Sequence, residues 1–143
     1  MRTPQTKLLG SIAIAWVALL QTRWVLRFGS LNSITPYLEP LKNRENANRP
    51  FTFYTHWHEA VRVAGRLHFG QPTCLPKALT LVRLLRQRGA NAHLCLGVAT
   101  RSGVLKSHAW VEVGGAMVNE PASVQHDFTR VNLAQWLGQA EAA

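Results

Sequence analysis

The order of segments predicts an α+β domain, in which helices come first and an antiparallel sheet follows. Helical patterns occupy residues 5–28 and 55–68, and a third helix with clear start and stop signals begins near Cys74. Short apolar runs separated by glycine turns then fill the C-terminal part. With 143 residues the chain has the length of one domain and can bury a substantial core.

The first segment carries thirteen uncharged residues, Leu8 to Leu20, after Arg2 and Lys7. A signal peptide is disfavoured because cleavage after Ala15 would leave too short an apolar run. The run is also shorter than the roughly 20 residues that cross a bilayer. We therefore expect a buried amphipathic helix over residues 5–28, with a helix lying on a membrane or on a partner protein as the alternative.

The middle of the chain predicts two further helices. In 55–68 the apolar residues step by three and four, as one face of a helix requires. The next helix has Thr73 as N-cap, Pro76 in its first turn and Gly89 just past its end. A polar, proline-bracketed loop precedes these helices.

The remainder predicts strands over 92–99, 107–113 and 116–119, and residues 127–138 predict a further short strand or turn plus a helix. Gly114-Gly115 marks a hairpin turn. We expect one domain over 1–143, with a helical extension over 1–50 and a core over 51–143.

Composition narrows the class of protein. The chain is 47% apolar and 16% charged, which excludes intrinsic disorder. Sixteen lysines and arginines against seven acids give a net charge of +9, which suits an acidic partner, but no nucleic-acid recognition element is evident. Two cysteines make no disulfide framework, so we expect a reducing, cytoplasmic setting.

Cys74 is the candidate nucleophile, because it sits in the first turn of the third helix. The helix dipole and the free backbone N–H groups stabilise a thiolate there, and the same groups can hold an oxyanion. His108, at the beginning of a predicted strand, is the candidate base. Its second ring nitrogen needs an acceptor, and Asn119 and Glu120 both lie on the next strand.

Hairpin register decides which acceptor faces His108. A two-residue turn pairs Val113 with Ala116 and puts Asn119 on the face of His108. A three-residue loop places Glu120 directly opposite His108 instead. We favour the three-residue loop because it pairs two large apolar residues on that face.

Other residues receive simpler interpretations. Gln71 precedes Cys74 by three residues and is a candidate oxyanion donor, although an ordinary loop role is the simpler interpretation. Cys95 lies on an apolar strand and is assigned to the core. His56-Trp57-His58 lacks a second cluster, so no metal and no cofactor are expected. The sequence assigns no role to His68, His93 and His126, and Asp127 is interpreted as a surface residue.

Five segments in order resemble the lasso-peptide biosynthesis B2 proteins, which are leader peptidases with a transglutaminase-like, papain-like cysteine-protease core. These segments are 74–79 (CLPKAL), 84–90 (LLRQRGA), 97–98 (GV), 108–115 (HAWVEVGG) and 118–120 (VNE). The resemblance implies a triad of Cys74, His108 and Glu120. The family usually has aspartate at the third position, so Glu120 is a departure and Asn119 is its stand-in.

The resemblance implies removal of the leader from a ribosomally made lasso-peptide precursor, together with a separate B1-type leader-recognition protein and a lasso cyclase. Membrane contact through residues 5–28 is the less favoured option. Two other functions stay open on the same residues. One is a non-catalytic peptide-binding module, and the other is a transglutaminase or acyltransferase, in which an amine replaces water.

Overall fold

The computed structural model describes residues 4–45, 48–132 and 135, and it confirms the predicted α+β class. Three long helices come first: α1 (Pro4–Phe28), α2 (Phe51–Leu67) and α3 (Cys74–Gln87). Two short 3-10 helices, η1 (Leu31–Ser33) and η2 (Thr35–Tyr37), connect α1 to the loop before α2. The remaining elements are β1 (Ala92–Arg101), β2 (Val104–Val113), β3 (Ala116–Met117), α4 (Val124–Asp127) and β4 (Thr129–Val131).

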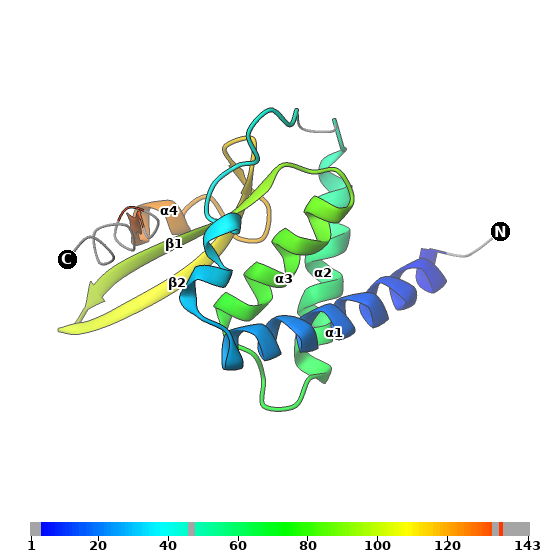
Figure 1. The fold of residues 1–143 in the computed structure, drawn as a ribbon, viewed down its shortest axis with the longest axis horizontal. Coiled ribbons are helices and arrows are strands. Elements are labelled where there is room, and N and C mark those ends of the chain that lie inside the picture. Colours follow the sequence, from blue (N-terminus) through cyan, green and yellow to red (C-terminus); the bar gives the residue numbers. More distant parts are fainter. Residues whose placement is uncertain (1–3, 46–47, 133–134, 136–143) are drawn as a thin grey trace.

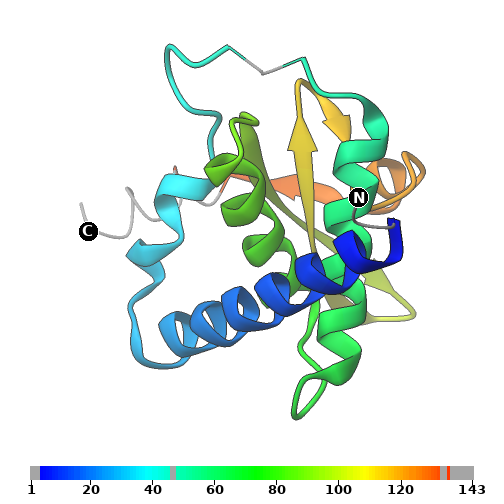
Figure 2. The same ribbon diagram turned by 90° about the vertical axis from the view of Figure 1, so that its right-hand side faces the viewer.

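The four strands form one antiparallel sheet in the order β3-β2-β1-β4. Helix α3 lies beside the sheet, and α1 crosses both α2 and α3 (Figures 1 and 2). Alternate residues of the strands, such as Leu94 and Val111, join α3 in the core, whereas His93, Cys95 and their neighbours at alternate positions point to the other face. Ala15 of α1 and Ile34 belong to the same buried cluster.

The predicted boundaries of α3 are confirmed. Thr73 is its N-cap residue, although its side chain makes no capping hydrogen bond. Gly89 follows the C-cap with a φ of 91°, and the N–H of Ala90 donates to the carbonyl of Leu85 over 3.0 Å. This is the glycine-terminated ending that the sequence indicates. The short strand predicted within 127–138 is β4, and of the helix predicted after it the structure describes Gln135 alone, as helical.

Helix α1 forms as predicted, but only part of its apolar surface is buried, so the prediction of a buried helix is wrong for the rest. Its buried residues step by four, four and three: Ser11, Ala15, Leu19 and Thr22. Polar contacts hold this seam, since Thr80 and Arg83 both donate to the Thr22 hydroxyl, over 3.0 and 2.8 Å. Seven large apolar side chains are left exposed: Leu9, Ile14, Val17, Leu20, Trp24, Val25 and Phe28.

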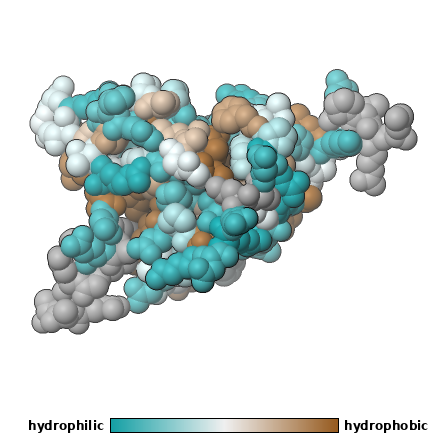
Figure 3. All heavy atoms as spheres, turned by 90° about the horizontal axis from the view of Figure 1, so that it is seen from above, coloured by the Kyte–Doolittle hydropathy of each residue, from teal (hydrophilic) through white to brown (hydrophobic). Residues whose placement is uncertain are grey.

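The exposed side of α1 gives the helix an unusual surface. Its length and composition alone would suit a membrane span, although core helices and signal sequences share that property. Elsewhere, too, hydrophobic residues reach the surface between hydrophilic ones, as on the face drawn in Figure 3. Surfaces of this kind mark contacts with other molecules.

The favoured three-residue loop between β2 and β3 is wrong. Val113 pairs with Ala116 and Glu112 with Met117, so the turn is Gly114-Gly115 alone. Both glycines have positive φ, 58° and 82°, which a two-residue turn of matching twist requires. That backbone preference outweighs the side-chain pairing on which the prediction relied.

Candidate active site

A cavity of about 120 Å³ lies where α2, α3, β2 and the segment after β3 meet. It brings together Cys74, His108, Asn119 and Glu120, which are four of the five candidate residues. The other residues that line it are His58, Val61, Arg62, Lys77, Leu81 and Ala109. The fold therefore gathers these candidates from three separate parts of the chain.

Cys74 is the first residue of α3, and its side chain is half-buried at the cavity wall. The first turn of a helix leaves its backbone N–H groups without partners inside the helix. The core side of the helix, with Ala78 and Leu81 both about 1% exposed, fixes its position. A negative charge forming beside Cys74 would meet these N–H groups at the positive end of the helix dipole.

His108 and Glu120 contact one another directly, with 3.2 Å between His108 Nε2 and Glu120 Oε1. Aromatic packing holds the imidazole, because its ring stacks on Phe128 at 5.3 Å and on Trp110 at 6.4 Å between centroids. Since Nε2 faces the carboxylate, Nδ1 is the ring nitrogen that can accept the proton of the Cys74 thiol. Within the described residues Cys74 makes no hydrogen bond to His108. Such contacts often tighten only when substrate binds.

Asn119 has a different partner. Its side-chain Oδ1 accepts a hydrogen bond from the N–H of Val111 over 2.9 Å, in the place of a strand carbonyl. The Val118 N–H still donates to the Val111 carbonyl over 3.0 Å, so backbone bonding to β2 extends one residue past β3. Glu120 then reaches His108 from a loop rather than from a paired strand position. The structure thus places Glu120 against His108, although the register is the one expected to favour Asn119.

Gln71 lies apart from these residues. It is exposed, has a φ of 26° and is not among the residues that line the cavity. Gly70, with a φ of 67°, precedes it in the tight connection from α2 to α3. Its role as an oxyanion donor stays a prediction.

His58 is a cavity residue that sequence reasoning missed. Burial lowers the pKa of His58, while the nearby Glu120 carboxylate acts in the opposite direction. Its neighbour His56 instead shares a 2.8 Å hydrogen bond with Ser11 on α1. His58, Val61 and Arg62 are spaced by three and four along α2, and this helical spacing was the available signal.

Two cations also line the cavity. The Arg62 guanidinium is paired, since its Nε donates to Glu59 Oε2 over 2.6 Å. Lys77 lies one helical turn after Cys74 and packs its aliphatic stem near Gly65. Glu59 offsets the charge of Arg62, so the cation that favours negative charge near the thiol is Lys77 on α3.

Cys95 is chemically different from Cys74. It is 4% exposed, and burial together with the nearby Glu112 carboxylate raises the pKa of its thiol to about 12. Both cysteines are free, as the sequence predicts. A thiol held protonated makes a poor nucleophile, so of the two cysteines Cys74 is the candidate for covalent chemistry.

The comparisons with known proteins define the family of the chain. A family profile described as the Transglutaminase-like superfamily matches residues 16–132, so the chain belongs to that superfamily. The chain is also related to the microcin J25-processing protein McjB of Escherichia coli, with 37% identity over 59 residues. The match covers 41% of this chain and 27% of the relative, so the chain spans about a quarter of that protein's length. No solved structure matches the chain.

Proposed function

We propose that this protein is a cysteine peptidase that removes the leader from a ribosomally made lasso-peptide precursor. The meeting of Cys74, His108 and Glu120 at one cavity is the observation that carries the proposal. Membership of the transglutaminase-like superfamily and the relation to a microcin-processing protein support it.

In the proposed mechanism His108 Nδ1 takes the proton of Cys74, and the sulfur attacks the carbonyl carbon of the scissile peptide bond. The oxygen of the tetrahedral intermediate accepts hydrogen bonds from the N–H groups of the first turn of α3. His108 then gives its proton to the leaving amine nitrogen, the C–N bond breaks, and a thioester remains on Cys74. Glu120 holds the imidazole in orientation and stabilises its positive charge.

Water completes the cycle in the peptidase. His108 removes a proton from water, the oxygen attacks the thioester, and the thiol regains its proton as the new carboxylate leaves. An amine in place of water would give the transglutaminase or acyltransferase alternative with the same residues. The relation to a processing protein favours water as the acceptor.

We further propose that a leader-recognition protein and a cyclase work with this chain in the cytoplasm. The exposed apolar side of α1 supports a protein partner. A hollow of about 370 Å³ lies there between Trp24, Phe28 and Phe69, next to Arg23 and Arg27. Aromatic and arginine side chains are enriched at protein interfaces.

The test is reconstitution of cleavage from the purified chain, a lasso precursor and its cognate recognition protein, followed by mass spectrometry. The unmodified chain should release intact leader and core fragments. Cys74→Ala should abolish cleavage, whereas Cys95→Ala, which removes the other thiol, should retain it. Cleavage by a correctly folded Cys74→Ala protein would overturn the proposal.

A further inference from the structure

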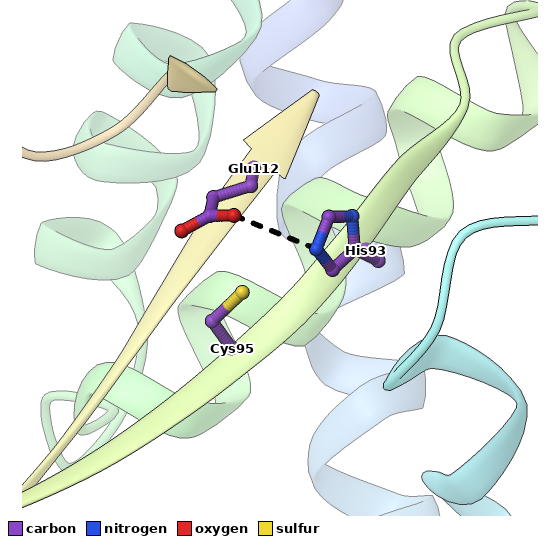
Figure 4. Close-up of side chains that lie close together, drawn as sticks. All are labelled: His93, Cys95 and Glu112. Carbon is purple, nitrogen blue, oxygen red and sulfur yellow. Dashed lines mark ion pairs between the residues drawn. The ribbon is translucent and has the colours of Figure 1, made fainter. Parts of the chain in front are cut away.

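Three metal-ligating side chains lie on the face of the sheet that points away from α3. His93 and Cys95 are two residues apart on β1, and Glu112 is the direct partner of His93 on β2. One ligand atom from each residue lies within 4.8 Å of the other two. Figure 4 shows the three side chains converging between the two strands, with the imidazole and the carboxylate joined across them.

The two oxygens of Glu112 are used differently. Oε1 accepts hydrogen bonds from Trp110 Nε1 over 2.9 Å and from Gln125 Nε2 over 3.3 Å, and it also contacts the Arg130 guanidinium. Oε2 faces His93 Nε2 at 3.6 Å, which is longer than a hydrogen bond. In many metal sites, hydrogen-bond donors hold one oxygen of a ligating carboxylate while its other oxygen binds the metal. The Glu112 carboxylate shows this arrangement.

His93 also lacks a full set of partners. Its side chain is only 12% exposed, and Nδ1 is buried without a hydrogen-bond partner among the described residues. Cys95 is buried beside it. The Cys95 thiol is hydrogen-bonded to Glu112, so an ion held by both residues would take the place of the thiol proton. The imidazole is the member of the cluster whose hydrogen-bonding capacity the described residues leave unused.

We propose that His93, Cys95 and Glu112 bind a zinc ion. Zinc accepts nitrogen, sulfur and oxygen ligands together, in a tetrahedron whose fourth position water can fill. A hollow of about 220 Å³ lined by His93, Cys95 and Arg130 gives access from solvent. On binding, the thiol proton passes to solvent and the Cys95 sulfur joins the ion as thiolate.

The positive charge of Arg130 does not exclude the ion. Its side chain is 53% exposed, so it remains solvated, and it contacts Oε1 rather than the oxygen that faces His93. The thiolate and the Glu112 carboxylate together bring two negative charges to the site. Bound zinc would fasten β1 to β2, and through Arg130 to β4, on the face opposite the core.

The test uses cobalt(II) as a coloured substitute for zinc. The chain has two cysteines, so Cys74→Ala leaves Cys95 as the one thiol. After dialysis against a chelator, titration of this full-length variant with cobalt(II) should give a thiolate-to-cobalt charge-transfer band that saturates at one equivalent. Zinc should then abolish the band, and His93→Asn in the same background should weaken cobalt binding at least about tenfold.

Absence of the band in the folded Cys74→Ala protein would overturn the proposal, as would undiminished cobalt binding after the His93→Asn change. Thermal unfolding provides a second readout. Zinc at about one hundred times its dissociation constant should raise the Tm of the Cys74→Ala protein by roughly 5–10 °C. No zinc-dependent rise in Tm would contradict a structural site.

Discussion

Gly97 lies opposite His108 in the β1–β2 ladder, and a side chain at this position would disturb the packing behind the proposed base. A Cβ added to Gly97 would lie 2.8 Å from Trp110 Cζ3 and 2.9 Å from Phe128 Cβ. Both partners would have to move by about half an ångström to restore ordinary contact at 3.4 Å. Trp110 is 1% exposed, so little free space can absorb the shift.

The Gly97→Ala variant should therefore lose stability. Overpacking of this kind costs about 1–3 kcal/mol, and the reduced freedom of the unfolded chain returns about 0.4–1 kcal/mol. A net loss of about 1–2 kcal/mol corresponds to a fall in Tm of roughly 3–8 °C. Because Trp110 and Phe128 both stack on His108, kcat for cleavage should also fall several-fold, with a smaller change in KM.

Gly10→Ala on α1 is the matched control. A Cβ at Gly10 meets nothing within 4 Å, so this change should stabilise the helix by about 0.5–1 kcal/mol. Thermal unfolding and precursor cleavage should be measured on both variants side by side. A Gly97→Ala protein with unchanged Tm and unchanged kcat would refute the packing argument.

Three further predictions address the cavity and α1. Glu120→Gln should lower kcat more than Asn119→Ala, because Glu120 contacts His108 while Asn119 contacts the Val111 N–H. Steady-state cleavage kinetics of the two variants test this order, and the reverse order would contradict the assigned roles. Burial lowers the pKa of His58 in the folded protein below its ordinary value near 6.5. Just below pH 6.5 the unfolded chain therefore binds more protons than the folded protein. The free energy of unfolding should then fall as the pH drops through this range. His58→Gln should make the free energy of unfolding depend less steeply on pH, as measured by urea titrations at several pH values. An unchanged pH dependence would refute this role of His58. His93, whose pKa burial also lowers, accounts for the pH dependence that remains in the variant. The double variant Trp24→Ser, Phe28→Ser should bind the recognition protein at least about tenfold more weakly in calorimetry. Its Tm should stay nearly unchanged, since both side chains are mostly exposed. Unchanged affinity for the recognition protein, or binding to lipid vesicles instead, would contradict a protein partner at this surface.

The hairpin shows how far sequence reasoning reaches. The turn, both strands and the two candidate acceptors follow from local residue preferences, but the choice of register was wrong. Side-chain pairing suggested the three-residue loop, whereas two positive-φ glycines form the shorter turn. Glu120 meets His108 nevertheless, because it lies in the loop after β3, where the Asn119 side chain instead of a strand carbonyl accepts from the Val111 N–H. That detail depends on a side-chain-to-backbone bond that no periodicity predicts.

The same limit applies to helix α1 and to the group formed by His93, Cys95 and Glu112. The apolar run predicts a helix correctly, but which side is buried depends on partners such as Thr80 and Arg83 on α3. His93 and Cys95 show the two-residue spacing of one strand face, yet Glu112 joins them only through the β1–β2 register. His58 likewise reaches the cavity through the packing of α2. The helices and strands could be predicted from local residue preferences. The contacts between residues far apart in the sequence could not, because they depend on how the elements pack.

The most direct test of the central claim is the fate of oxygen during cleavage. The reaction should be run in water labelled with oxygen-18, and the mass of the released leader should be measured within a single turnover. We expect one labelled oxygen in the new C-terminal carboxylate, formed by the unmodified protein and not by Cys74→Ala. A released leader without the label, or labelled leader formed equally fast by Cys74→Ala, would contradict hydrolysis through a Cys74 thioester.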